Sequence, residues 1–575
     1  MTSGGADNDN EVFGAASTDE GRSDDGGGGG GVLERNTSLL VERDKSGEEN
    51  RERWGNRTEF LFASIGSAIG VGNILRFPIL VYRHGGLAFL APYGASLLLL
   101  GIPLLKLETG MGQLLQSGAG LAFAKVHPKV YGVGLTATFC SGIVAWYYSI
   151  LMAWSAVYLA SSFTNPLPWA GGLEAAEDYF SKGVVNMNAS LADGFGALQW
   201  KLVLGLLASW VSVFFAIFRG TKSMGLVLYV TLPLPFVLLT ILLIRGATLP
   251  GAGTGVQYYF GRWEWSAFAD GTIYVEAVSQ IFFSLSLSQG VMQGYASNNE
   301  SSSPYISNAW IVGLANSSAS IFAGFALFST LGYLSEQSGV SIEDLAEPGF
   351  SLAFITYPTA LSTFAPGWAQ FFSFSFFATL LMLGIDSLFS LVEVIVYLIT
   401  DINPRAGHKY RWLVALVLCT FFFLISLVFV SRGGYWLVDI VDHYIVSYAV
   451  VAVGLLECVV MAFVYGLRRF DKELHKLTGQ ANSRVWFFCI WIVVPLILAI
   501  LFVYNFVLEF QGNVPDSIRR QPAWSVGIFG WWFCVATPFL VLLPLGLIVP
   551  WKQNLVLLPS PAQMGKSESE MSIGG

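Results

Sequence analysis

Twelve long apolar segments constrain the fold of this chain more than any other feature of its sequence. A helix needs about 20 consecutive, mainly apolar residues to cross a bilayer. Of the 575 residues, 54% are hydrophobic and only 12% are charged, which excludes an ordinary soluble protein. We therefore predict an all-α membrane protein with twelve transmembrane helices. The segments are residues 59–82, 86–115, 132–163, 202–218, 225–245, 272–296, 309–334, 367–400, 411–431, 435–467, 485–509 and 523–549.

The two ends of the chain differ from this membrane body, which we place at residues 51–550. Residues 1–50 contain twelve acidic and four basic residues, which accounts for the whole net charge of −8. They are also rich in glycine and poor in apolar residues, so we expect a disordered acidic tail. No apolar run precedes residue 50, so no cleavable signal peptide is expected there. Residues 551–575 form the C-terminal tail.

Clusters of Lys and Arg predict the orientation, because such clusters favour the cytoplasmic side. If the chain crosses the membrane twelve times, all of these clusters lie on the same side. We therefore place both tails in the cytoplasm and expect a multi-pass protein of the plasma membrane. Arg519 and Arg520 fit this less well. Residues 164–200 then lie outside, where the sequon at Asn188 predicts a glycosylated asparagine. The clusters are at residues 51–57, 125–129, 219–222, 405–411 and 468–472.

The first apolar segment contains residues that a simple membrane anchor does not need. Gly66, Gly70 and Gly72 are followed by Asn73 and Arg76. Glycine weakens a helix, and a polar group in lipid needs a partner. We therefore expect a helix that opens at membrane depth, so that freed backbone groups hold a small charged ligand. Close helix packing through a Gly-x-x-x-Gly pair is the alternative; it explains the glycines but neither polar residue.

The sixth apolar segment carries a second interruption. Between Gln280 and Gly290, three serines alternate with leucines. The alternatives are a strand, which lipid disfavours, and a helix whose serines bond their own backbone. If residues 59–245 and 272–467 are two halves, the two broken helices occupy matching positions. That arrangement predicts a 5+5 inverted repeat with a midplane site, followed by two extra helices within residues 485–549.

Motifs of soluble enzymes are missing from the sequence. All five cysteines lie in apolar segments, and no Cys/His spacing suggests zinc. No nucleophile elbow or phosphate loop occurs. A membrane enzyme with Glu108 as acid or base is an alternative, but no matching nucleophile or metal set accompanies it. We expect no enzyme activity and no nucleic-acid partner, and the oligomeric state stays open.

Six short motifs, in this order, resemble the neurotransmitter:sodium symporter family over residues 50–550. The resemblance implies sodium-driven uptake of amino acids, amines or osmolytes by ten helices in two inverted halves plus two more. The motifs are Arg51-Glu-Arg-Trp54, Asn73-Ile-Leu-Arg76-Phe-Pro78, Gly85-Gly86 before Pro92-Tyr93, Tyr147-Tyr148, Gln280-Ile-Phe-Phe-Ser284 and Leu383-Gly-Ile-Asp386-Ser387.

The resemblance implies bound Na⁺ and Cl⁻. One sodium site would use Ala68, Asn73, Ser284 and Asn316. The other would use the backbone of Gly66, Ile69 and Leu383 and the side chains of Asp386 and Ser387. Chloride would contact Tyr93, Gln280, Ser284, Asn316 and Ser320. Chloride-independent bacterial relatives carry a carboxylate at the position of Ser320, so its absence predicts chloride dependence; a neutral hydroxyl and amide network is the alternative.

Physical chemistry agrees with the sodium assignment. Sodium is a hard cation that prefers several oxygen ligands. Asp386 lies in an apolar segment, where a carboxylate is costly unless a cation pairs with it. A hydrogen bond between helices is the alternative role for this side chain.

The same resemblance places the substrate between the two breaks. Monoamine members carry an aspartate at the position of Gly70, so here backbone carbonyls would meet the substrate amine, while Tyr148 and sodium would meet a carboxylate. This predicts a small amino acid or similar zwitterion. A GABA-, taurine- or betaine-like osmolyte and a channel-like or other non-transporting ligand-binding relative are alternatives. The expected lining is Ala68, Gly70, Gly72, Val144, Tyr148, Phe283, Ser284, Ser286, Gln289, Ser387 and Leu391.

Two gates follow from the resemblance, as alternating access requires. Arg76 and Asp442 would close the outer vestibule. Arg51 and Asp401 would close the inner mouth, with Trp54 as a plug. Plain interfacial salt bridges are the alternative, and exposed pairs contribute only ~0–1 kcal/mol. Glu108 would bracket the opened backbone of the first break.

Overall fold

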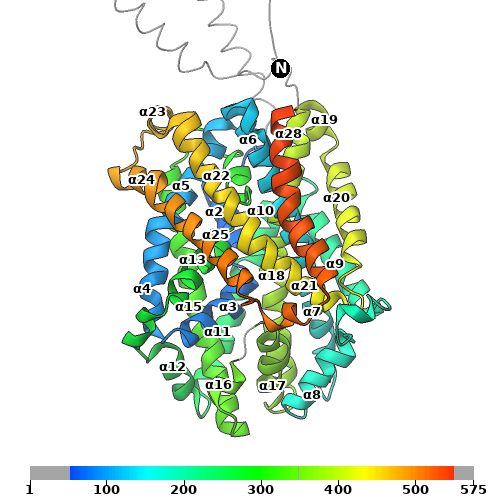
Figure 1. The fold of residues 1–575 in the computed structure, drawn as a ribbon. Helices are drawn as coiled ribbons and strands as arrows, with labels where there is room; N and C mark the ends of the chain where they lie inside the picture. Colours follow the sequence, from blue (N-terminus) through cyan, green and yellow to red (C-terminus); the bar gives the residue numbers. More distant parts are fainter. Residues whose placement is uncertain (1–51, 347–348, 549–575) are drawn as a thin grey trace, which may run out of the picture. The chain divides into compact units, whose positions relative to one another are not determined.

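The computed structural model describes residues 52–346 and 349–548, which belong to one structural unit (Figure 1). Both predicted tails, and Arg51, lie outside the described residues. Within them the chain is helical, and the β-structure consists of two isolated bridges, Gly86 to Trp263 and Leu198 to Ser431. The prediction of an all-α protein is therefore confirmed for this part of the chain.

Every predicted apolar segment contains helix. Not every one of these helices, however, is long and apolar enough by itself to cross a membrane. In the described residues nine helices are long and apolar enough to cross a membrane, and one bent pair makes a tenth. The bent pair is the first segment. The sixth segment is interrupted, and the ninth, α20 (Arg411–Ser426), is short. A multi-pass membrane architecture is clear, whereas the number twelve and the inverted repeat stay predictions.

The main helices have the following bounds. They are α2 (Arg57–Ala68), α3 (Val71–Arg83), α4 (Leu87–Ser96), α5 (Ile102–Leu115), α7 (Tyr131–Ser161), α9 (Trp200–Ile217), α10 (Thr221–Thr231), α11 (Pro233–Ala247), α13 (Thr272–Ser284), α14 (Val291–Ala296), α15 (Tyr305–Ser338), α18 (Trp368–Ile402), α21 (Gly434–Tyr444), α22 (Val451–Val459), α23 (Leu467–Thr478), α25 (Val494–Phe510) and α28 (Leu543–Ile548). Shorter helices α8 (Leu173–Asp178), α16 (Ile342–Leu345) and α17 (Tyr357–Ser362) lie at one end of the unit, and α6 (Ala119–Val126) and α19 (Pro404–Lys409) at the other (Figure 1).

The predicted first break is confirmed between α2 and α3, whose axes differ by 53°. Ile69 and Gly70 leave the helical conformation for extended backbone. The Asn73 side chain accepts a hydrogen bond from the Gly70 amide at 3.0 Å and so caps α3. Helix ends leave backbone groups without partners in their own helix. The break therefore presents carbonyls of α2 and amides of α3 at one point.

The predicted second break is also confirmed, between α13 and α14. Ser286 (φ +50°), Ser288 (φ +62°) and Gly290 (φ +79°) adopt the left-handed conformation. Such backbone costs a residue other than glycine about 1–3 kcal/mol. Both the strand alternative and the continuous-helix alternative are therefore wrong here.

Long helices enclose the two breaks. α2 packs against α10, α15 and α18, and α14 packs against α5, α18 and α2. α7 lies along α18 and α9. The interrupted segments thus lie inside the bundle, where irregular backbone at membrane depth is tolerated.

Candidate functional site

A small polar cavity lies between the two helix breaks. All eleven residues predicted to contact the substrate line it, together with three others. The volume open to the centres of water-sized molecules is about 40 Å³. A water needs about 10–15 Å³ of such volume, so this arrangement fits only a small ligand without side-chain movement. The lining is Ser67, Ala68, Gly70, Gly72, Asn73, Val144, Tyr148, Gln280, Phe283, Ser284, Ser286, Gln289, Ser387 and Leu391.

A larger hollow of about 430 Å³ lies between α2, α11 and α15, but its chemistry differs. Its walls are Phe62, Phe322 and other apolar side chains, and Ser318 is the one polar side chain among its lining residues. Such a surface has few groups to pair with a charged ligand. We therefore take the smaller, polar cavity as the candidate site.

Gly70 leaves room for ligand because no side chain stands at this point of the first break. A Cβ atom there would lie 2.9 Å from the Ser387 hydroxyl and 3.2 Å from the Tyr148 hydroxyl. Tyr148 Oη accepts a hydrogen bond from the Val71 amide at 3.2 Å, so its own proton is free to be donated. The cavity thus offers a hydroxyl donor beside open backbone, which suits a carboxylate and an amine on one small molecule.

Next to the cavity, Asn73 is the centre of a buried polar cluster. Its Nδ2 donates to Asn316 Oδ1 at 2.7 Å, Ser320 Oγ at 2.8 Å and Ser284 Oγ at 3.1 Å. The Ser284 hydroxyl and the Asn316 amide also interact directly, at 2.9 and 3.1 Å. The structure therefore brings together three of the four residues predicted for one sodium site. Ala68 lines the adjoining cavity.

Asp386 carries the least compensated charge near the breaks. The residue is fully buried, and neither carboxylate oxygen has a hydrogen-bond partner within residues 52–346 and 349–548. The Thr231 hydroxyl lies near the carboxylate but donates to the Val227 carbonyl at 3.1 Å. A Cβ atom on Gly66 would lie 3.3 Å from Asp386 Oδ2, so the carboxylate faces the end of α2.

An uncompensated buried carboxylate beside free carbonyls fits a cation. No group of three His, Cys, Asp or Glu side chains suited to a metal occurs in the described part of the chain. The donors around Asp386 are therefore mainly neutral oxygens, such as the Leu383 carbonyl and the Ser387 hydroxyl, which lie 3.3 Å apart. One carboxylate with neutral oxygens suits a hard monovalent ion better than a transition metal.

The predicted chloride residues lie together, with one addition. Tyr93 Oη lies 3.1 Å from Ser317 Oγ, a residue that the sequence analysis did not include. Ser320 Oγ donates to the Asn316 carbonyl at 3.0 Å, and Gln280 Oε1 is buried without a hydrogen-bond partner in the described residues. Hydroxyl and amide groups that converge without a carboxylate can meet an anion.

Arg76 and Asp442 form no ion pair within the described residues, so the outer closure by these two side chains stays a prediction. Arg76 Nη2 forms its ion pair with Glu276 Oε2 of α13 at 3.0 Å, and both side chains are more than one-third exposed. Asp442 is close enough to interact electrostatically with Arg76, yet no ion pair joins them among the residues described. α13 packs on α3, and this packing places Glu276 of α13 beside Arg76 of α3.

Trp54 is the predicted plug of the inner mouth, a role that stays a prediction. It is buried, and its Nε1 donates to the Tyr295 carbonyl at 2.9 Å just after the second break. Asp401 accepts a hydrogen bond from the Gly118 amide at 2.7 Å. Because Arg51 lies outside the described residues, its pair with Asp401 stays a prediction.

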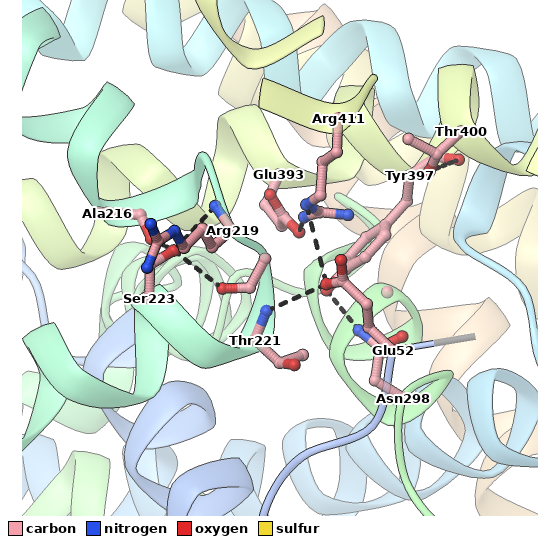
Figure 2. Close-up of polar contacts among 12 residues, drawn as sticks. Glu52, Ala216, Arg219, Thr221, Ser223, Asn298, Glu393, Tyr397, Thr400 and Arg411 are labelled. Carbon is pink, nitrogen blue, oxygen red and sulfur yellow. Dashed lines mark hydrogen bonds and ion pairs between the residues drawn. The ribbon is translucent and has the colours of Figure 1, made fainter. Parts of the chain in front are cut away.

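A buried ionic cluster close to the start of α2 was not predicted from the sequence. Figure 2 shows Arg411 between Glu393 of α18 and Glu52, which precedes α2. Arg411 pairs directly with Glu393, and its Nε lies 3.8 Å from Glu52 Oε2. The Thr221 amide donates to the same Glu52 oxygen at 3.3 Å. Glu393 in the eighth apolar segment could have indicated this cluster, because a charge at membrane depth requires a partner.

Glu108 brackets a different break from the one predicted. Its Oε1 accepts a hydrogen bond from the Ser288 amide at 2.6 Å, so it holds the second break and not the first. Because Ser288 has left-handed backbone, its amide makes no helical hydrogen bond and can donate to Glu108 of α5 instead.

The predicted glycosylation site lies in a structured loop. Asn188 is partly buried, and its Nδ2 donates to the Gly194 carbonyl at 2.9 Å. Its backbone carbonyl accepts a hydrogen bond from Trp436 Nε1 at 2.9 Å. Glycosylation would require this amide to turn outward, and it stays a prediction.

Comparison with known proteins identifies the relatives of this chain. The model of the sodium:neurotransmitter symporter family matches residues 51–173 and 171–554. The chain is 32% identical over 548 residues to the sodium- and chloride-dependent glycine transporter 2 of Xenopus laevis, covering 85% of this chain and 68% of that protein.

Two further relatives match over similar lengths. The sodium- and chloride-dependent neutral and basic amino acid transporter B(0+) of Mus musculus is 33% identical over 546 residues, covering 85% of each protein. The sodium- and chloride-dependent taurine transporter of Bos taurus is 33% identical over 535 residues, covering 88% of this chain and 85% of that protein. The chain therefore belongs to the sodium:neurotransmitter symporter family and is a membrane transporter, not an enzyme.

Proposed function

We propose that this chain is a sodium- and chloride-dependent symporter that carries a small zwitterionic amino acid into the cell by alternating access. The single observation that supports it most is the buried, unpartnered carboxylate of Asp386 beside the end of α2. We further propose twelve spans in a 5+5 inverted repeat plus two, in the plasma membrane, with both termini cytoplasmic and Asn188 glycosylated outside.

Sodium would bind at two places. One ion would pair with Asp386 and take carbonyl oxygens of Gly66, Ile69 and Leu383 and the Ser387 hydroxyl. Burying an isolated carboxylate is very costly, so a cation there stabilises the closed bundle. The second ion would lie at Ala68, Asn73, Ser284 and Asn316, replacing hydrogen bonds that these side chains make to one another.

Chloride would bind next to this second ion, among Tyr93, Gln280, Ser284, Asn316 and Ser320. These side chains are neutral, so an anion adds the negative charge that balances a nearby sodium. The related glycine, amino acid and taurine transporters are known as sodium- and chloride-dependent, which supports the proposal.

The substrate proposal rests on size and charge. The cavity leaves about 40 Å³ for the centres of water-sized molecules, and this small space favours a molecule close to glycine or alanine in size. With Gly70 in place of an acidic side chain, the amine would meet carbonyls of the breaks, and the carboxylate would meet Tyr148 and sodium. The buried Gln289 amide gives this wall a polar character.

Alternating access needs closures that can break and reform. The exposed Arg76–Glu276 pair suits this, because exposed ion pairs contribute only ~0–1 kcal/mol. On the inner side, Trp54 and the Glu52–Arg411–Glu393 cluster would separate when α2 moves. Sodium and substrate shift the balance between states only through their different affinities for each.

The test is uptake of labelled glycine, alanine, leucine, lysine and taurine into proteoliposomes containing the full chain. We expect uptake of the smallest amino acids, lost when choline replaces sodium and strongly reduced when gluconate replaces chloride. Asp386→Asn should abolish uptake, whereas the matched change of an exposed carboxylate, Asp344→Asn, should not. Uptake that persists without sodium would end the proposal; uptake that persists without chloride would remove only the anion site.

A further inference from the structure

Two buried carboxyl groups contact the second break and the helix that follows it. Glu108 of α5 is fully buried and accepts the Ser288 amide at 2.6 Å. Glu457 of α22 is 2% exposed, and its Oε1 accepts a hydrogen bond from Gln293 Nε2 of α14 at 2.8 Å. The two carboxyl groups interact electrostatically. Residues of three different helices thus converge on one short stretch of strained backbone.

Buried polar atoms without partners point into this cluster. Glu108 Oε2 and Ser288 Oγ have no hydrogen-bond partner in the described part of the chain. The Ser288 hydroxyl nonetheless lies against Glu457 and would be 2.7 Å from a Cβ atom on Gly454, one turn earlier on α22. Buried polar groups are normally hydrogen-bonded. The cluster therefore lacks at least one hydrogen that its oxygens require.

The groups that face the two carboxyls include no cation. α5 contributes the Met111 sulfur, α14 contributes Gln293, α22 contributes the Cys458 thiol, and the break contributes Ser288. No Lys, Arg or His among the described residues interacts with either carboxyl. Two adjacent buried carboxylates without a cation cannot both be ionised, because each repels the other and both have lost their water.

We propose that Glu108 and Glu457 together bind one proton, and that this proton clamps the second break in its closed form. One of the two carboxyl groups carries the proton on an oxygen and donates it within this cluster, where Glu108 Oε2 and Ser288 Oγ have no other hydrogen-bond partner in the described residues. The proton belongs to the pair and not to either residue alone. It supplies the hydrogen missing from the buried oxygens and leaves a single negative charge, which the Ser288 amide and Gln293 stabilise.

Release of the proton to water would leave two negative charges in this cluster. Their repulsion would push α5 and α22 apart and loosen the backbone at Ser288. The same break supplies Ser284, Ser286 and Gln289 to the cavity. The proton is thus coupled to the ligand cavity, and this holds whichever substrate the protein carries.

The first test is infrared spectroscopy of the purified full chain in lipid nanodiscs, in sodium buffer at neutral pH. We expect a protonated carboxyl C=O band that is lost or shifted in Glu457→Gln and in Glu108→Gln, because glutamine donates N–H in place of the shared proton. Asp386→Asn and the exposed control Glu336→Gln should leave the band unchanged. The absence of a band, or a band that disappears only in Asp386→Asn, would overturn the proposal.

The second test is the pH dependence of thermal stability. A proton that the folded protein binds and the unfolded chain does not stabilises the fold at low pH, and that stabilisation is lost as pH rises. We expect the melting temperature of the unaltered protein to fall on the alkaline side more steeply than that of Glu457→Gln. Parallel curves for the two proteins would contradict a shared proton even if the glutamine variant is less stable overall.

Discussion

The two helix breaks open for different reasons. The first opens through local sequence: Gly70 adopts extended backbone, and Asn73, three residues later, accepts its amide at 3.0 Å. The second is held by residues far away in the chain: Ser288 adopts left-handed backbone and donates to Glu108, 180 residues earlier. The Gly70 amide is thus held by a residue of its own segment, whereas the Ser288 amide is held by a residue of α5.

We infer that this difference affects how each break responds when the surrounding helices move. The hydrogen bond from the Gly70 amide to Asn73 can persist when neighbouring helices move, because both residues belong to one segment. A break held by other helices responds when those helices move, because its strained backbone of about 1–3 kcal/mol per residue persists only while the surroundings enforce it.

Gly70→Asp should abolish uptake. A Cβ atom at this position would lie 2.9 Å from Ser387 Oγ, and the added carboxylate would oppose the carboxylate of the substrate. Initial uptake rates, normalised to the amount of protein in the membrane, measure the effect. Gly94→Ala is the matched control, because its Cβ atom would meet no atom within 4 Å. Normal uptake by the aspartate variant would place the ligand elsewhere.

Gly290→Ala should lower the free energy of unfolding by about 2 kcal/mol. Its φ of +79° costs an L-residue roughly 1–2 kcal/mol, and its Cβ atom would lie 2.5 Å from that of Ala119. Thermal melting of the purified protein, compared with Gly253→Ala on the surface helix α12 (Ala252–Phe260), checks this. Equal stability of the two variants would mean that the second break is not strained.

Asn73→Ala should cost about 1 kcal/mol of stability, the usual effect of losing a helix cap, and should raise the sodium concentration needed for half-maximal uptake. The variant loses the cap on Gly70 and the three side-chain partners of Nδ2. Sodium titration of uptake and a melting curve measure the two effects. An unchanged sodium dependence would remove Asn73 from the ion site.

Ser288→Gly should stabilise the protein slightly, by up to roughly 1 kcal/mol, because glycine accepts left-handed backbone without strain. The same substitution in a regular helix, Ser212→Gly in α9, should destabilise by about 1 kcal/mol. Opposite signs in the two melting experiments support strain at the second break. A loss of stability in both would indicate that the Ser288 side chain contributes more than its backbone costs.

The sequence predicted the features that depend on one segment alone. Glycines and an asparagine within an apolar segment were enough to locate the first break, and the alternating serines located the second. The eleven residues predicted for the substrate come from four apolar segments and rest on the family resemblance; all of them line one cavity. That they bind it stays a prediction.

Pairings between distant residues could not be predicted in the same way. Arg76 pairs with Glu276, 200 residues away, and Arg411 joins Glu52 to Glu393. Several carboxylates lie at comparable positions along the apolar segments, and only the packing of the helices decides which one reaches a given cation. The partner of Glu108 could not be predicted either, because it depends on the direction in which the Ser288 amide of the second break points.

In the proposed mechanism, Asp386 pairs with sodium at the end of α2. Binding of radiolabelled sodium to the purified full chain, without substrate, tests it most directly. We predict that Asp386→Asn loses one bound sodium ion per chain relative to both the unaltered protein and Asp344→Asn. Equal sodium binding by all three proteins would contradict the claim.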